Sequence, residues 1–471
     1  MKRYIALADE LTASIRAGQL RPGDRLPSVR HTSRSRRVSP ATVFQAYYLL
    51  EARGLIAARN RSGYYVTALA AARPRILHKP STPKAGSIAV DVGERVFEIL
   101  GATMHREVVP LGSAFPAPTL FPLARLAGAM ASAVKRLDPR TSVEYLLQGN
   151  LALRQRIALR YALDGMRLRD DDIVITNGAM EALNLCLAAV TRPGDAVVIE
   201  SPAFYAALQA LERNGLRAIE APTHPQHGID LEALETILRE QRPRACWLMP
   251  NFQNPLGSLM PDDNKRQLVD LLTRHDTPLI EDDVYAELYF GERRPLPAKA
   301  FDRAGIVLHC SSFSKCLAPG YRIGWAIPGR YAQTVARLKL SASLTASVPA
   351  EAALATYLQG GGYDRHLRTL RRALAAQRDR MLDAIGNFFP AATSVTLPQG
   401  GYFVWLQCAR GVNAIRIHEL ALAARISVAP GPIFSSRREF RNCLRLNYGH
   451  PWSDAVESAV RTLGQLVAQR D

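Results

Sequence analysis

The chain has 471 residues, enough for two to four domains of about 150 residues each. Its hydrophobic fraction of 48% is ordinary for a folded protein and excludes disorder along the whole chain. The net charge of +18 is unevenly placed: residues 1–85 carry 16 Lys and Arg against 4 Asp and Glu, and the rest carries 44 against 38. A basic N-terminal block on a near-neutral body indicates that the block binds a polyanion, most often nucleic acid.

The six cysteines form no CxxC pair and no cysteine–histidine cluster with zinc spacing. We therefore expect free thiols in a reducing compartment and no metal site. No apolar run approaches the roughly 18 to 20 residues of a membrane-spanning helix, and the start MKRYIALADEL carries acids where a signal peptide is apolar. These features predict a cytoplasmic protein with no membrane segment.

The N-terminal segment predicts three helices and a β-hairpin. Apolar residues at helical spacing predict the first helix over residues 4–17. Ser28 and Ser39 are candidate N-caps of the second and third helices, and Pro40 occupies the first position of the third. The segment LIAARNRSGYYVT predicts two strands around a turn. This order is typical of an α+β winged helix-turn-helix, whose last helix enters the major groove of DNA.

The third helix has two distinct faces. Four apolar side chains at i, i+3, i+4 and i+7 form its predicted core face: Val43, Ala46, Tyr47 and Leu50. The residues expected to point outward near its start are Ala41, Thr42, Phe44 and Gln45.

This stretch resembles the DNA-binding domain of the GntR family of bacterial regulators. The matching segments are GQLRPGDRLPSVR, VSPATVFQAYYLLEARGLI and RSGYYV, and the resemblance covers about 65 residues. The resemblance implies double-stranded DNA as a partner, contacted by Arg30, Thr42, Phe44, Gln45, Arg59 and Arg61. The arginines at 34, 36 and 37 either belong to that surface or form an ordinary solvated face. The second helix differs from the family in its polar residues, which predicts weak packing: Thr32, Ser33, Ser35 and Arg36.

We expect a DNA-binding domain over residues 1–67, a linker over 68–105 and a large domain over 106–471. Residues 68–85 contain three prolines and little periodicity, which is typical of a semi-extended linker. In the large domain, apolar runs such as DIVITNG alternate with helical patterns such as AMEALNLCLAAV. The alternation predicts a mainly parallel sheet with ligands at the carboxyl ends of its strands.

One motif of the large domain, SSFSKCLAPGYRIGW at residues 311–325, suggests phosphate binding. Lys315 follows the apolar run IVLHC and lies close in sequence to Ser312, Ser314 and Arg322. Two hydroxyls and a guanidinium can bind a phosphate dianion while the amine reacts with a carbonyl. For this motif alone, a surface lysine beside an ordinary arginine is an equal alternative.

Two further motifs decide between these readings. IEDDVYAELY places Asp282 after an apolar pair and three residues before Tyr285, and PNFQNPLGS places Asn254 in a turn. In this order the motifs resemble the fold type I pyridoxal 5′-phosphate enzymes, the aspartate aminotransferase superfamily, from about residue 106 to the end. The resemblance implies an α/β transferase fold, a smaller C-terminal α+β subdomain, pyridoxal 5′-phosphate as cofactor and a homodimer.

The resemblance also assigns roles to individual residues. Lys315 would be the catalytic residue that forms the internal aldimine, and Asp282 would pair with the pyridine nitrogen. Asn254 and Tyr285 would hydrogen-bond the phenolic oxygen. The phosphate would be bound by three side chains and by two backbone amides at a helix N-terminus: Ser312, Ser314, Arg322, Ala179 and Met180.

Three more residues take roles from the same resemblance. Phe204 would stack on the pyridine ring, although Tyr205 could do so instead; the less favoured alternative for Phe204 is a core residue. Tyr145 would reach the phosphate of the neighbouring subunit. Arg445, in CLRLNYG, would bind the carboxylate of a substrate or effector through bidentate hydrogen bonds, unless it is an ordinary strand arginine.

A GntR-like head on an aminotransferase-like body is the arrangement of the MocR subfamily of bacterial regulators. It implies a transcription regulator that senses a small amine or amino acid by transaldimination at Lys315. The alternative is an active aminotransferase that carries a DNA-binding head, and some transaminase activity fits either function. A purely structural body is disfavoured because the residues needed for cofactor chemistry are all present.

Overall fold

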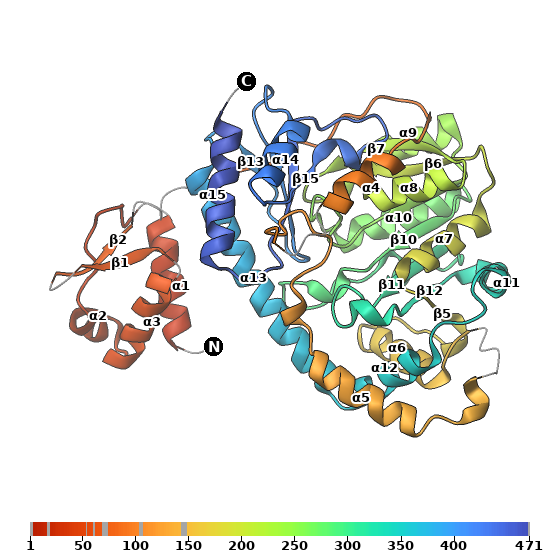
Figure 1. Cartoon of the computed structure of the whole chain (residues 1–471), viewed down its shortest axis with the longest axis horizontal. Helices are drawn as coiled ribbons and strands as arrows, with labels where there is room; N and C mark the ends of the chain where they lie inside the picture. The colour runs from red at the N-terminus through yellow and green to blue at the C-terminus, as the bar shows by residue number, and fades with distance from the viewer. Residues whose placement is uncertain are drawn as a thin grey trace.

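The computed structural model describes residues 3–16, 19–52, 54–59, 62–67, 74–102, 107–142 and 148–469. They form a small N-terminal head and a large body (Figure 1). Within these ranges, no helix is sufficiently long and apolar to cross a membrane. The same ranges hold no group of three or more His, Cys, Asp or Glu side chains placed to share a metal ion.

The three helices and the hairpin predicted for the head are confirmed. They are α1 (Arg3–Arg16), α2 (Val29–Arg36), α3 (Pro40–Ala52), β1 (Ile56–Arg59) and β2 (Gly63–Val66). The side-chain oxygen of Ser28 accepts a hydrogen bond from the amide of His31, and that of Ser39 accepts one from the amide of Thr42. Both serines therefore cap their helices as expected.

The head core lies between α1, α3 and the hairpin. The four predicted core residues of α3 are fully buried. Thr32 of α2 is also buried, 2.8 Å from the hydroxyl of Tyr47, which donates a hydrogen bond to the carbonyl of Pro27. Helix α2 is thus attached through a buried hydrogen bond at Thr32, one of the polar positions from which weak packing was predicted.

Part of the predicted linker is built into the body. It contains β3 (Arg75–Ile76), β4 (Ile88–Ala89) and α4 (Gly93–Ala102). Strand β3 extends the sheet of the small subdomain, whereas β4 extends the large sheet. In the segment between β3 and β4, the Ser81 amide donates to the Thr223 carbonyl at 3.1 Å, and the Ser81 hydroxyl accepts from the Thr223 amide at 3.0 Å. The chain that follows the head is therefore attached to both subdomains.

The large subdomain is built on a mixed, mainly parallel sheet in the order β4-β7-β6-β9-β10-β11-β12-β5, with β8 paired to β7. Strand β12 is antiparallel to both neighbours, as β4 is to β7. The remaining strands are β5 (Val174–Thr176), β6 (Ala196–Ser201), β7 (Arg217–His224), β8 (Gly228–Ile229), β9 (Ala245–Leu248), β10 (Leu279–Asp282), β11 (Val307–Ser312) and β12 (Gly324–Ile327).

Successive strand residues point to opposite faces of this sheet, and apolar residues occur on both faces. Helices therefore cover both faces. Val198 packs in a core with α9 and α10, while Val197 and Ile199 pack in the core that includes α7 and α8. The helices of this subdomain and its edge are α5 (Leu123–Lys135), α6 (Leu151–Leu163), α7 (Ala179–Val190), α8 (Tyr205–Arg213), α9 (Leu231–Gln241), α10 (Asp262–Arg274), α11 (Ala332–Ala342) and α12 (Val348–Gln359).

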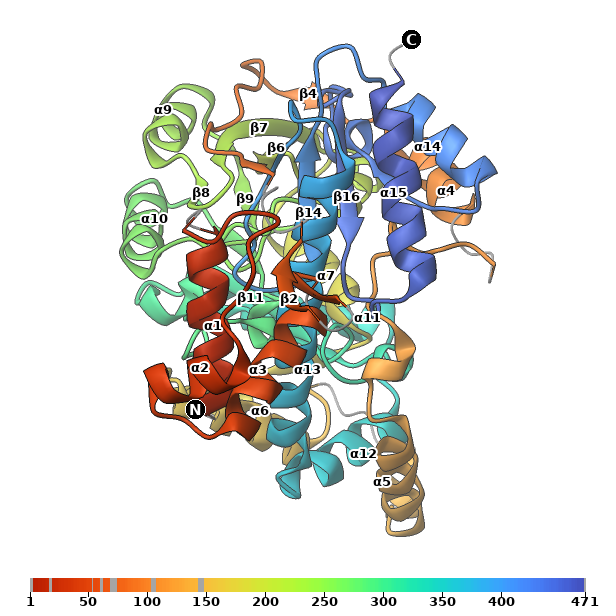
Figure 2. The same ribbon diagram turned by 90° about the vertical axis from the view of Figure 1, so that its left-hand side faces the viewer.

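The smaller C-terminal subdomain is an α+β unit, as predicted. Its sheet has the order β15-β16-β14-β13-β3. Helix α13 is the longest described helix and packs beside α15 (Figure 2). The elements are α13 (Gly362–Phe388), β13 (Ser394–Val395), β14 (Phe403–Gln407), α14 (Ala414–Ala423), β15 (Ala429–Pro430), β16 (Cys443–Asn447) and α15 (Asp454–Ala468).

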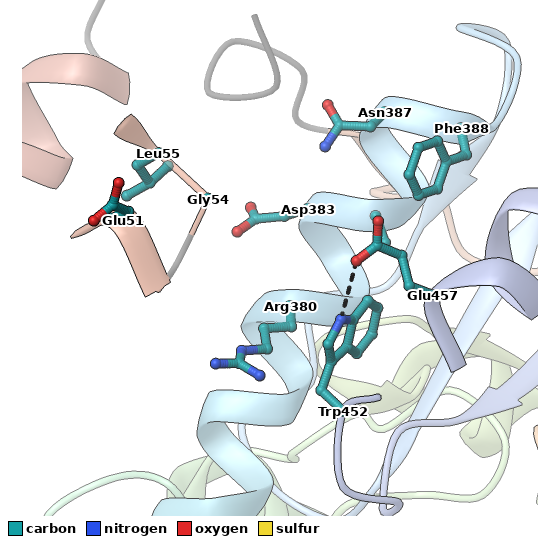
Figure 3. Close-up of a pocket in the computed structure, with 10 residues that line it drawn as sticks. Glu51, Gly54, Leu55, Arg380, Asp383, Asn387, Phe388, Trp452 and Glu457 are labelled. Atoms are coloured by element: carbon teal, nitrogen blue, oxygen red, sulfur yellow. Dashed lines mark hydrogen bonds between the residues drawn. The ribbon is translucent and has the colours of Figure 1, made fainter. Parts of the chain in front are cut away.

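The head faces the small subdomain across a cavity of about 230 Å³ (Figure 3). The head contributes the end of α3 and the turn after it, at Glu51, Gly54 and Leu55. The body contributes residues of α13 and α15 and the segment before α15, including Trp452. The C-terminal end of α3 is therefore the end turned toward the body.

Candidate active site

The candidate active site lies where β10 and β11 end, beside the N-terminus of α7, as expected for a mainly parallel sheet. Asp282 is the last residue of β10, and Lys315 follows β11 by three residues. The fold brings to this place most of the side chains that the sequence predicted for the cofactor.

Lys315 and Asp282 form the charged centre of the site. Burial lowers the pKa of the Lys315 amine to about 7, an effect that Asp282 opposes and that Arg445 and Arg322 increase. Burial also raises the pKa of Asp282 to about 7, against the attraction of Lys315. Both groups therefore change protonation near neutral pH.

Asn254, Tyr285 and Arg445 line the same site, and all three are buried. A guanidinium nitrogen of Arg445 donates to the Asn254 side-chain oxygen at 3.0 Å. Its guanidinium carbon lies 4.1 Å from the ring centre of Phe403. Burial lowers the pKa of Arg445 and raises that of the Tyr285 phenol. The arginine is thus a buried cation with aromatic neighbours, not an ordinary surface-strand residue.

The predicted phosphate-binding side chains also come together. The amide of Ser314 donates to the Ser312 hydroxyl at 3.3 Å, and Arg322 donates to the Ser314 hydroxyl at 3.3 Å. Gly178 makes room for this arginine: with its φ of +81°, an added Cβ would lie 2.5 Å from an Arg322 nitrogen. The guanidinium therefore lies against the N-terminus of α7.

Backbone amides supply the rest of an anion site. Helix α7 begins at Ala179, directly after Gly178, so the amides of Ala179 and Met180 belong to the first turn and have no partner within the helix. A helix N-terminus with a guanidinium beside it attracts a phosphate group.

The ring-stacking position has two aromatic candidates. Phe204 precedes α8 and is partly buried, whereas Tyr205 is buried. Their ring centres are 4.9 Å apart, and Tyr205 is 5.7 Å from Phe434. Burial raises the Tyr205 pKa, while Arg445 opposes that shift. Phe204 therefore remains the ring-stacking prediction, and Tyr205 is placed next to the arginine.

A loop that the sequence did not single out, residues 112–115, covers the site. Its Ala114 carbonyl accepts from the Lys315 amine at 3.0 Å, and the amine lies 3.8 Å from the ring centre of Phe115. The carbonyls of Gly112 and Ser113 accept from Arg445 at 2.7 and 3.3 Å. The loop thus occupies the donors of both predicted ligand-binding cations.

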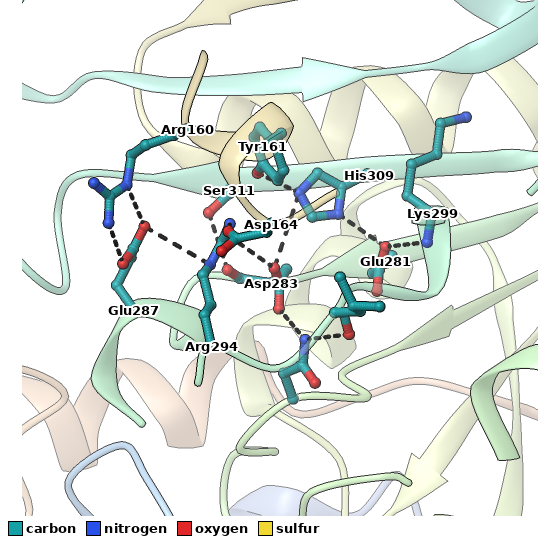
Figure 4. A network of polar contacts seen from close by, with 12 residues as sticks. Arg160, Tyr161, Asp164, Glu281, Asp283, Glu287, Arg294, Lys299, His309 and Ser311 are labelled. Atoms are coloured by element: carbon teal, nitrogen blue, oxygen red, sulfur yellow. Dashed lines mark hydrogen bonds and ion pairs between the residues drawn. The ribbon is translucent and has the colours of Figure 1, made fainter. Parts of the chain in front are cut away.

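A network of buried charges supports the end of β10 (Figure 4). His309 of β11 bonds Glu281 at 2.8 Å, and Asn251 donates to Asp283 at 2.8 Å. Arg294 pairs with Asp164 at 2.7 Å. The two carboxylates on either side of Asp282 are therefore held by neighbouring elements, which fixes the strand end that carries Asp282. The sequence signal for this network was the row of acids in IEDD.

Three buried polar atoms of the site have no hydrogen-bond partner among the described residues: Asp282 Oδ1, Asn254 Nδ2 and Arg445 Nε. Buried polar atoms are normally paired, so their convergence is suited to a polar ligand. Asp282 Oδ1 would accept a hydrogen bond from the pyridine nitrogen of pyridoxal phosphate, and Asn254 Nδ2 would donate one to its phenolic oxygen. The residues present therefore fit the cofactor that the sequence predicted.

On the head, Arg30, Phe44, Gln45 and Arg59 are exposed, and Thr42 is partly exposed with its hydroxyl 2.9 Å from that of Ser39. Arg59 lies over the ring of Tyr65 in the wing. Two predicted site residues, Arg61 and Tyr145, lie outside the described residues. The described DNA-contact candidates thus come from α2, α3 and the wing.

Comparisons with known proteins agree with this fold. Residues 3–66 match the bacterial regulatory proteins of the gntR family, and residues 118–463 match aminotransferase class I and II. The chain is 47% identical to the uncharacterized HTH-type transcriptional regulator YdcR of Escherichia coli (strain K12), over 100% of both chains. It is 31% identical to the 2-aminoadipate transaminase of Thermus thermophilus, over 78% of this chain and 92% of that one.

Solved aminotransferase structures resemble the body. The multiple substrate aminotransferase of Thermococcus profundus has a TM-score of 0.73 and 27% identity, covering 80% of this chain and 95% of that chain. LysN, the α-aminoadipate aminotransferase of Thermus thermophilus, has a TM-score of 0.72 and 29% identity, covering 80% and 98%. That structure holds N-(5′-phosphopyridoxyl)-L-leucine.

Fold and site together define a winged helix-turn-helix head joined to an aminotransferase-type body. The chain belongs to the aminotransferase class I and II family, with a GntR-family head, which is the MocR-type architecture.

Proposed function

We propose that this chain is a DNA-binding transcription regulator that binds pyridoxal phosphate and detects a small amine or amino acid at Lys315. The observation that carries the proposal is the convergence of Lys315, Asp282 and the unpaired amide of Asn254 in one site. The same chain carries a winged helix-turn-helix, which a metabolic enzyme does not need.

The site residues have separate tasks. Bound pyridoxal phosphate supplies an aldehyde that condenses with primary amines and a ring that withdraws electrons from that carbon. With a pKa near 7, the Lys315 amine is largely neutral just above neutral pH and can act as a nucleophile. Asp282 would keep a proton on the pyridine nitrogen, and the Asn254 amide would donate to the phenolic oxygen.

Arg445 would select ligands that carry a carboxylate. This role is supported by the hydrogen bonds of its guanidinium to Asn254 and to the carbonyls of loop 112–115. A carboxylate would take the place of the loop carbonyls, so ligand binding would move the loop. Such a change alters DNA binding only if the ligand binds the two states with different free energies.

The cofactor part of this function is tested by the absorbance of purified protein supplied with pyridoxal phosphate. We expect a visible band that Lys315→Ala abolishes and that Lys135→Ala, a change of an exposed lysine on α5, leaves intact. A wild type that takes up no cofactor would refute the assignment of the site. For DNA, we expect binding to the chain's own upstream region to weaken steeply with salt, because phosphate contacts release counterions.

The second candidate function is catalysis of amino-group transfer. It is favoured by the presence of Lys315, Asp282 and Arg445 together and by the similarity to aminotransferases. The protein should be incubated with one amino acid and an excess of a second keto acid as amino-group acceptor, and assayed for the keto acid formed from the amino acid. Several equivalents of keto acid per site would support an enzyme, whereas a spectral shift without turnover would support a sensor.

A further inference from the structure

Two exposed aromatic side chains lie one helical turn apart on α3. Phe44 is 56% exposed and Tyr48 is 68% exposed, although large apolar rings are usually buried. Residues at i and i+4 are neighbours on a helix surface, so the two rings form one patch. The patch lies on the face of α3 that points away from the head core.

The head that carries this aromatic patch also exposes several arginines. Arg30 and Arg34 are exposed on α2, and Arg59 is exposed on the wing. Two carboxylates of the head are engaged elsewhere: Glu10 pairs with Arg36 at 2.7 Å, and Glu51 accepts from the amide of Ala58 at 2.9 Å. An apolar centre with a basic rim fits a polyanion that has apolar groups between its charges.

The body does not cover the patch. The body faces the head at the C-terminal end of α3, around Glu51 and Leu55, whereas Phe44 lies nearer the start of the helix (Figure 3). The exposed fractions of the two rings refer to the whole chain, with the body present. The partner that best fits this surface is therefore duplex DNA. Its phosphates would contact the arginines while α3 enters the major groove.

We propose that Phe44 and Tyr48 read thymines through their 5-methyl groups, which are the apolar groups on the floor of the major groove. Phe44 lies in the second turn of α3, in the half of a recognition helix that faces base edges. Phenylalanine has no hydrogen-bonding group, so it can tell bases apart only by this apolar contact. This inference rests on the proposed function as a DNA-binding protein, and it names the bases that the head prefers.

The test removes single methyl groups from the DNA. A preferred duplex is first selected from a random library with the full-length chain, and each thymine is then replaced in turn by deoxyuridine. For wild type, we expect at least one replacement to weaken binding about fourfold, the value for one buried methyl group. The same replacement should have no effect on Phe44→Ala, and a reduced one on Tyr48→Ala.

Phe97 provides a matched control, because it is an exposed phenylalanine on α4 of the body. Phe97→Ala should bind as wild type does and keep the full deoxyuridine effect. If deoxyuridine weakens wild type and Phe44→Ala equally, or weakens neither, the thymine contact is refuted while DNA binding itself stands. If no duplex is bound in a salt-dependent way, the proposed function fails as well.

Discussion

Replacement of Arg445 by alanine tests whether the site recognises a carboxylate. The arginine is fully buried on β16 and donates to one side-chain oxygen and two loop carbonyls. Its remaining guanidinium nitrogen, Nε, has no partner in the part of the chain that the structure describes. The group is thus placed to bind a carboxylate through two hydrogen bonds.

The size of the effect follows from those hydrogen bonds. A hydrogen bond to a charged group contributes about 1.5 to 3 kcal/mol, so two would contribute about 3 to 6 kcal/mol. The arginine must first give up its carbonyl partners in loop 112–115, which offsets part of this gain. We therefore expect a net loss near the lower bound, about 3 kcal/mol, or roughly 100-fold in affinity.

The assay is a spectral titration of the cofactor-loaded protein with pairs of ligands. Each amino acid that shifts the spectrum is compared with the amine that lacks only its carboxylate. Arg445→Ala should weaken the amino acid about 100-fold and the amine by less than about threefold. Arg416→Ala, a change of an exposed arginine on α14, should alter neither. An equal loss for both ligands would show that Arg445 supports the fold of the site without binding the carboxylate.

Three further predictions concern the phosphate site, pH and the head. Gly178→Ala forces a Cβ to within 2.5 Å of Arg322 and should weaken cofactor binding about tenfold in equilibrium dialysis. Gly194→Ala, also at positive φ but with open space around it, should leave cofactor affinity unchanged. Burial raises the pKa of Glu200 from 4.5 to about 8, so between these values the folded chain keeps a proton that the unfolded chain releases. The free energy of unfolding should therefore fall as the pH rises from 5 to 8. In urea titrations Glu200→Gln should make this fall smaller, and an unchanged slope would mean that Glu200 is ionised in the folded protein. Tyr47→Phe removes the hydroxyl that links α2 to α3 and should destabilise the head by about 1 to 2 kcal/mol. The α2 amides should then exchange hydrogen faster than in wild type; equal exchange would contradict the role of that hydrogen bond.

The sequence predicted those parts that depend on local signals. Ser28 and Ser39 cap their helices through atoms three residues away, so both helix starts could be read directly. Asp282 and Ser312 end neighbouring parallel strands, and the alternation of strands and helices predicts that such ends meet at one edge.

Contacts between distant residues could not be predicted in this way. Lys315 meets a carbonyl 201 residues away, and Arg445 meets Asn254 across 191 residues. The loop that covers both cations contains no motif, because it binds them through backbone carbonyls that any residue can supply. The polar attachment of Thr32 was missed for a similar reason: its burial depends on a tyrosine hydroxyl from another helix.

The strands that follow the head have a consequence for the body as a separate unit. Strand β4 ends the order of the large sheet, and β3 ends that of the small one, so each protects an edge. A fragment beginning at residue 106 would lose both strands and leave β7 and β13 with unpaired backbone groups, which are templates for pairing with other chains. The body should therefore stay dispersed when it begins near residue 74 and self-associate when it begins at residue 106.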